Sequence, residues 1–150
     1  MTQALHIALA DEVVALLAGQ TFVLPMVVRR YYVPFYRLDR DGDLTHALVV
    51  PRSRQSERVS RAERQREVGL DVGIMRRVPE WVPEGLQEVG RGSLDDLSAL
   101  VGEVEDFLAD AVVPSYNARP VAVQVDPIYS PEHLEQWSQF TSVVTVSYRV

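Results

Sequence analysis

Hydrophobic residues recur every three or four positions in two long segments, which is the period of a helix with one buried face. The first stripe covers residues 3–18 and predicts an N-terminal helix. A stronger stripe follows Ser93 and predicts a second helix that ends before Pro114. The pair Ser130-Pro131 is typical of a helix start, because serine caps the first turn and proline fits the first helical position, so we expect a short helix to about Trp137.

Between these helices the hydrophobic pattern changes to strands. Some segments are rich in β-branched and aromatic residues, and others alternate with a period of two. The segments that we predict as strands are 21–38, 44–50, 67–76, 119–125 and 140–150.

Proline and turn-forming residues mark where the strands are expected to begin, end and turn. Pro25 and Pro34 cannot donate to a strand ladder, so they are expected to bracket the first strand. Residues 39–43 contain Gly42 and three aspartates and predict a turn, so the first two strands are expected to form a hairpin.

The order of these elements predicts the fold class. One apolar stripe on each helix and one alternating face on each strand indicate an α+β fold of two layers. We expect a mixed, mostly antiparallel sheet of about five strands packed against two helices. The chain of 150 residues is long enough for one domain, 1–150, with a long hairpin arm at 52–66.

Composition removes several functional classes. The chain contains no cysteine, which excludes thiol catalysis, Cys-ligated metal centres and disulfides. No run of eighteen apolar residues is present, so no helix is expected to span a bilayer and no membrane partner is expected. The hydrophobic fraction of 47% and charged fraction of 24% are those of an ordinary globular domain.

Charge is distributed unevenly along the chain. The net charge is −6, and all 15 basic residues are arginine. Six arginines fall between Arg52 and Arg66, whereas Arg91 is the one basic residue among nine acids between Glu80 and Asp110. An acidic protein repels nucleic acid, and the arm has no aromatic residue to stack on bases, so no specific nucleic-acid binding is expected.

The motifs of common catalytic and metal sites are absent. His6, His46 and His133 lie far apart in the sequence and lack the spacing of a metal site. The aspartates of residues 39–43 begin like a calcium loop, but Leu44 and Val50 occupy its glycine and glutamate positions. We therefore expect no catalytic residue, no cofactor, no metal and no enzymatic activity.

The arginine-rich arm is the feature that the fold alone does not explain. A loop of more than about twelve residues without regular structure is uncommon and is often functional. We expect this arm to become ordered on assembly, when the basic arm of one subunit reaches the acidic helix of its neighbour, as in a ring. The candidate interface residues are Arg52, Arg54, Arg58, Arg61, Arg64, Glu103, Asp106 and Trp81.

Several segments at both ends of the chain carry distinctive residue strings. The C-terminal part carries Asp126–Leu134 (DPIYSPEHL) followed by Phe140–Arg149, and the N-terminal part carries Val28–Tyr31 (VRRY), Val50-Pro51-Arg52 and Ser60-Arg61. These residues, and the order of elements, resemble the tail terminator (tail-completion) and neck proteins encoded in head–tail joining clusters of phages and prophages.

The resemblance implies a structural role in the virion, after assembly in the host cytoplasm. Such proteins form a ring, expected to be a hexamer, that caps the tail tube and meets the head connector. The implied partners are therefore copies of the chain itself, the tail tube protein and the head-completion or connector protein. Two alternatives remain from the residues alone. One is a ligand-binding or enzymatic domain with a pocket beneath the Trp81 loop, and the other is a nucleic-acid-binding module that uses the arm.

Overall fold

The computed structural model describes residues 3–38, 44–79, 81 and 91–150. The predicted turn at 39–43 and most of the segment around Trp81 therefore lie outside the described residues. Helices and strands follow one another along the chain in this order: α1 (Leu5–Ala18), β1 (Met26–Arg30), β2 (Thr45–Arg58), β3 (Arg64–Arg77), α2 (Arg91–Asp110), η1 (Pro114–Tyr116), β4 (Arg119–Val125), α3 (Pro131–Trp137) and β5 (Gln139–Arg149).

The helices form where the hydrophobic period predicts them. Helix α1 buries Leu9, Val13 and Leu17 along one stripe. Helix α2 begins at Arg91, two residues before the predicted start, so Ser93 lies inside its first turn and does not precede it. Helix α3 starts as predicted, because the Ser130 hydroxyl accepts a hydrogen bond from the His133 backbone N–H at 3.3 Å.

The strands form one mixed sheet in the order β1-β2-β3-β5-β4. Strands β2, β3, β5 and β4 pair antiparallel, whereas β1 pairs parallel with β2. The predicted hairpin between the first two strands is therefore wrong. Only Met26–Arg30 of the predicted 21–38 segment is a strand, because the chain beyond it leaves the sheet edge and crosses the sheet over β3 and β5.

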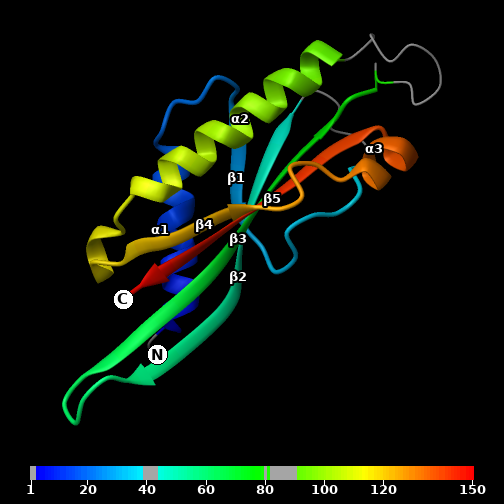
Figure 1. Cartoon of the computed structure of the whole chain (residues 1–150). Coiled ribbons are helices and arrows are strands. Elements are labelled where there is room, and N and C mark those ends of the chain that lie inside the picture. Colours follow the sequence, from blue (N-terminus) through cyan, green and yellow to red (C-terminus); the bar gives the residue numbers. More distant parts are fainter. Residues whose placement is uncertain (1–2, 39–43, 80, 82–90) are drawn as a thin grey trace.

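The main core lies between one face of the sheet and helices α1 and α2. Val72 of β3 contributes to this core together with Val49 and Val144, its partners on β2 and β5. Helix α1 packs over β1 and β2, and α2 packs over β4 and β5. The fold is thus the expected two-layer α+β arrangement (Figure 1).

A strap formed by residues 31–38 covers part of the opposite face. The Gln139 side chain holds it by accepting from the Leu38 N–H at 2.7 Å and donating to the Tyr36 carbonyl at 2.9 Å. The strap passes so close to β3 that a Cβ at Gly73 would overlap the Pro34 carbonyl oxygen. This second face therefore has a small core of its own, formed with Leu38, Leu48, Val50 and Met75.

The arm is an extension of two central strands. The pairing of β3 with β5 ends at Glu67, whereas the pairing of β2 with β3 continues to Arg58 and Arg64. Figure 1 shows this two-stranded ribbon projecting past the helices at the lower left. The hairpin arm is confirmed, but it already has regular strand structure in the isolated chain, so its ordering does not require assembly.

Candidate functional site

Arg52, the first residue of the predicted arm, belongs to the sheet. Its guanidinium donates to the Thr145 hydroxyl at 3.1 Å and lies 3.4 Å from the Asp71 carboxylate. Thr145 in turn donates to the same Asp71 oxygen at 2.7 Å. These contacts tie Arg52 to β3 and β5, so it is not the free arm contact that the sequence predicts.

Arg52 also occupies a β-bulge. Pro51 pairs with Leu70 and Ser53 pairs with Gly69, so the residue between them has no partner of its own on β3. One extra residue shifts the alternation of the strand, because successive side chains point to opposite faces. Beyond the bulge, Arg54 therefore lies on the helix-bearing side of the sheet, opposite the core residue Val68.

The bulge brings arginines of both strands of the ribbon to the same face. Ser56 pairs with Arg66, and Arg58 pairs with Arg64. Directly opposed residues in an antiparallel pair share a face. We call the resulting surface the arginine face; it is formed by Arg54, Arg58, Arg64 and Arg66.

The arginine face is open, and none of its guanidinium groups forms an ion pair among the described residues. All four side chains are exposed, and no described carboxylate lies within ion-pair distance of them. A hollow of about 180 Å³ separates Arg54, Ser56, Arg64 and Arg66. A larger hollow of about 460 Å³ shares Arg64 and Arg66 with it and is also lined by Arg58, Arg61, Glu63 and the C-terminal Val150.

The other face of the ribbon has the opposite character. It carries Gln55 and Glu57 from β2 and Gln65 and Glu67 from β3. The Arg149 guanidinium lies 3.2 Å from the Glu67 carboxylate, so the negative charge there is partly balanced within the chain. The ribbon is therefore cationic on one side only.

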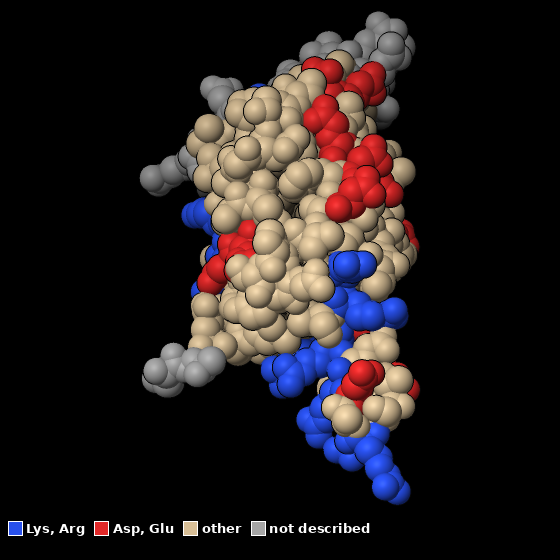
Figure 2. Space-filling view, turned by 90° about the vertical axis from the view of Figure 1, so that its left-hand side faces the viewer, with Lys and Arg blue, Asp and Glu red and all other residues tan. Residues whose placement is uncertain are grey.

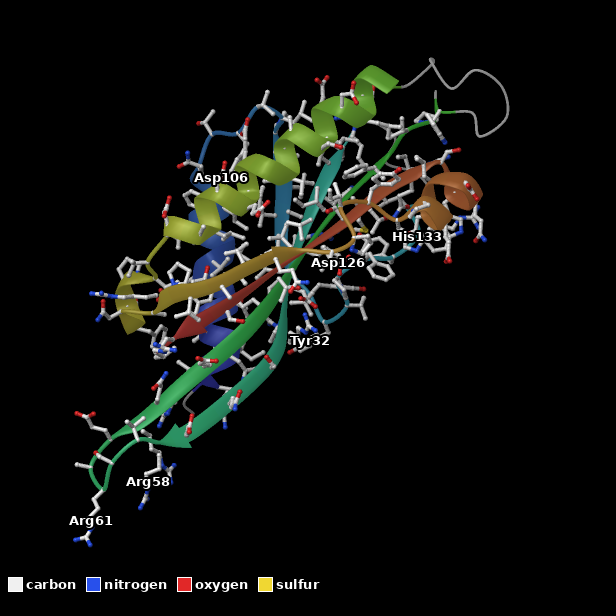
Figure 3. All side chains as sticks on the ribbon, in the orientation of Figure 1. Tyr32, Arg58, Arg61, Asp106, Asp126 and His133 are labelled. Atoms are coloured by element: carbon white, nitrogen blue, oxygen red, sulfur yellow. The ribbon has the colours of Figure 1, made fainter. Side chains whose placement is uncertain are left out.

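Arg61 lies at the tip of the ribbon, beyond the paired residues that form the arginine face. The tip is closed by Val59, whose N–H donates to the Glu63 carbonyl at 3.1 Å, and by the Ser60 hydroxyl, which accepts from the Glu63 N–H at 3.2 Å. The Arg61 side chain extends beyond this turn into solvent (Figure 3). It is exposed, and Arg61 and Arg58 both line the larger hollow of the ribbon.

The two acidic candidates on α2 differ in their surroundings. The Glu103 carboxylate is half-buried and accepts a hydrogen bond from the Val23 backbone N–H at 3.0 Å, so it anchors the segment after α1. Asp106 is exposed. Three further exposed carboxylates lie on the same helix, at Asp95, Asp96 and Asp110.

The acidic helix and the basic ribbon occupy opposite ends of the molecule. Figure 2 shows the carboxylates at the α2 end and the arginines on the projecting ribbon. Among the described residues, no ion pair joins the ribbon to α2 within one chain. The sequence predicted this separation of charge, but it missed Arg66 as part of the surface. The period of two in residues 54–58 and 64–66 is the signal that would have identified it.

Trp81 packs against the main core as a half-buried side chain, and its backbone N–H donates to the Val78 carbonyl at 3.0 Å. Only the exposed part of the Trp81 side chain is therefore available for the interface contact that the sequence predicts. The ligand-binding alternative places a pocket beneath the Trp81 loop, and residues 80 and 82–90 of this loop lie outside the described residues.

The described histidines do not form a reactive group. They come from α1, β2 and α3, and no three metal-binding side chains gather anywhere in the described part of the chain. His133 stacks on Trp137 with ring centres 4.2 Å apart and meets the edge of Phe35 at 5.0 Å. Burial between these rings lowers the pKa of His133, although the nearby Glu132 acts in the opposite direction.

An apolar hollow of about 300 Å³ lies beside the C-terminal end of α1. It is lined by Leu17, Phe22, Leu24 and Met26, among others, and none of its lining residues is ionisable. Such a hollow offers packing but no acid or base. The arginine face is therefore the candidate functional surface.

Comparison with known proteins gives no assignment. No protein-family model matches the chain, and no curated protein is significantly similar to it. Among the described residues, no helix is both long and apolar enough to cross a membrane.

Proposed function

We propose that the chain is a virion structural protein, a ring-forming tail terminator or neck subunit of a phage or prophage. The single observation that supports this proposal most directly is the projecting ribbon with its one-sided arginine face. Extending two strands beyond a sheet exposes backbone and side chains that contribute nothing to the chain's own core. Such an element is suited to contact with another subunit.

The separation of the charged surfaces is compatible with a ring. When each subunit uses its two surfaces to contact two different neighbours, the contact is heterologous, and it closes into a ring when the rotation between neighbours divides a full turn. On this proposal the ring caps the tail tube and meets the head connector, and the body of the domain provides a rigid support. The chain itself carries out no chemical reaction.

Electron microscopy of tails tests the proposal. The purified protein would be added to growing tubes of the tail tube protein from the same phage or prophage. We expect a ring at one end of each tube and an end to elongation. Tubes that continue to grow, with no added density at either end, would contradict the proposal.

A further inference from the structure

The arginine face places like charges in direct opposition. Arg58 and Arg64 are cross-strand partners, and Arg66 follows Arg64 on the same side of β3. Like charges directly opposite each other destabilise an antiparallel pair. The ribbon therefore carries an electrostatic cost that a partner rich in carboxylates would remove.

Helix α2 carries an unfavourable cluster of negative charges at its C-terminal end. Asp106 and Asp110 are four residues apart, so they lie next to each other on the helix surface and repel. Both lie in the C-terminal part of α2 (Arg91–Asp110), where the negative end of the helix dipole disfavours additional negative charge. No described arginine or histidine forms an ion pair with either carboxylate. A cationic group from a partner would therefore stabilise this end of the helix.

Part of the acidic row on α2 matches the arginine face in length. Arg54 and Arg58 are separated by about 14 Å along a strand at roughly 3.4 Å per residue. Asp96 and Asp106 are separated by about 15 Å along a helix at roughly 1.5 Å per residue. The full row of exposed carboxylates, from Asp95 to Asp110, extends over about 22 Å by the same measure, so the flexible arginine side chains at the ends of the face would have to reach outward to pair with all four.

The contact must form between different molecules, because the ribbon and α2 lie at opposite ends of one chain (Figure 2). We propose that the arginine face of one copy binds the exposed carboxylates of α2, Asp95, Asp96, Asp106 and Asp110, on a second copy. Glu103 is not part of this contact, because its carboxylate is held by the Val23 N–H. The inference rests on the self-assembly in the proposed function, and it identifies the surfaces through which the subunits bind each other.

A second copy fits the arginine face better than a nucleic acid does. A chain with a net charge of −6 repels a polyanion over most of its surface. The arginine face also has no aromatic side chain on which a base could stack. Because exposed ion pairs each contribute little, the contact depends on several pairs at once and weakens as salt is added.

Thiol cross-linking tests the contact without changing any charge. The chain has no cysteine, so two introduced thiols are the only reactive ones. Ser56→Cys places one on the arginine face. Ala99→Cys places the other on the exposed side of α2, three residues after Asp96 and seven before Asp106.

With a short bismaleimide at low salt, the Ser56→Cys/Ala99→Cys protein is expected to give a ladder of cross-linked oligomers that disappears at high salt. The matched control is Gln55→Cys/Ala99→Cys, because Gln55 is adjacent to Ser56 but lies on the other face of the ribbon. Equal ladders from the two variants, or no ladder from either, would overturn the inference.

Charge reversal provides a second, independent measurement. In sedimentation equilibrium at low salt, Arg58→Glu/Arg64→Glu and Asp106→Arg/Asp110→Arg are each expected to weaken self-association by at least about tenfold. Combining all four substitutions in one chain restores the opposite charges and is expected to restore association. A wild type that stays monomeric, or a combined variant as weak as its parents, would contradict the proposal.

The same variants separate this inference from the proposed function. Tail capping by the wild type together with equal capping by Arg58→Glu/Arg64→Glu would overturn the inference alone. Self-association through the arginine face without any capping of tails would overturn the proposed function alone. If charge reversal abolishes binding of duplex DNA but leaves self-association unchanged, the arginine face binds nucleic acid and the inference is wrong.

Discussion

Arg58 and Arg64 face each other across the β2–β3 ladder, on the side of the sheet that carries the helices. The next position along β3, Gln65, lies on the other side and pairs with Glu57. Residues 64 and 65 are therefore neighbours in sequence but belong to different surfaces. This relationship allows the function of the ribbon to be tested with single substitutions.

Arg64→Gln and Gln65→Glu each change the net charge from −6 to −7. If the arginine face carries self-association, Arg64→Gln weakens it several-fold, whereas Gln65→Glu has little effect because it alters the other face. Sedimentation equilibrium at low salt measures both. Equal weakening by the two variants would show that overall charge, and not a particular face, controls association.

Gly73→Ala is expected to destabilise the protein by about 3 kcal/mol, because the new Cβ would collide with the Pro34 carbonyl oxygen and push the strap away from β3. Chemical denaturation measures the loss. Gly102→Ala is the matched control. No atom lies within 4 Å of a Cβ built at Gly102 in α2, so this substitution is expected to stabilise the helix by about 0.5–1 kcal/mol. A stable Gly73→Ala protein would contradict the close contact between strap and sheet.

Tyr148→Phe is expected to stabilise the protein by about 1 kcal/mol, because burying a hydroxyl without a hydrogen bond is unfavourable. Tyr148 is fully buried, its burial raises the pKa of its phenol, and the hydroxyl has no partner in the described part of the chain. Tyr36→Phe serves as the comparison, because the Tyr36 hydroxyl accepts from Arg29 at 2.9 Å. The loss of that bond is expected to lower stability slightly. Urea unfolding is expected to give a higher free energy of unfolding than the wild type for Tyr148→Phe and a lower one for Tyr36→Phe. A destabilised Tyr148→Phe protein would be inconsistent with an unpaired hydroxyl.

His133 is expected to make stability depend on pH in the mildly acidic range. Because burial lowers its pKa in the folded protein, the unfolded chain takes up a proton first as pH falls. This contribution to the free energy of unfolding is complete above the unfolded pKa of about 6.5, and it decreases as pH falls from there through the lower folded pKa.

The test is His133→Phe, which retains an aromatic ring between Phe35 and Trp137. Unfolding free energies measured from pH 7.5 to pH 5 are expected to decrease less steeply for the variant than for the wild type. Parallel curves would mean that His133 has no role in the pH dependence.

Much of the fold could be predicted because it follows from local sequence. The period of Leu9, Val13 and Leu17 predicts α1, and the pair Ser130-Pro131 predicts the start of α3. The pairing of the first two strands could not be predicted, because it depends on where residues 31–38 pack. An aromatic segment followed by a turn also fits a hairpin, and only the contact of Pro34 with Gly73 shows that the segment crosses the sheet.

The site was predictable in composition but not in arrangement. The sequence shows many arginines between Arg52 and Arg66, but it does not show that Arg52 is tied to Asp71 and Thr145. It also does not show that the Glu103 carboxylate accepts a hydrogen bond from the Val23 N–H, since these residues are far apart in the chain. Long-range contacts of this kind decide which charged side chains remain available to a partner.

The bulge at Arg52 gives the ribbon a property that its amino-acid composition does not determine. If the same residues paired without this bulge, alternation would continue unbroken from Pro51, and the side chains of Arg54 and Arg58 would exchange sides with those of Gln55 and Glu57. A chain of the same length and charge would then divide its guanidinium groups between two sides. In a lineage of such proteins, a substitution that removes the bulge is therefore a route to an abrupt change of partner.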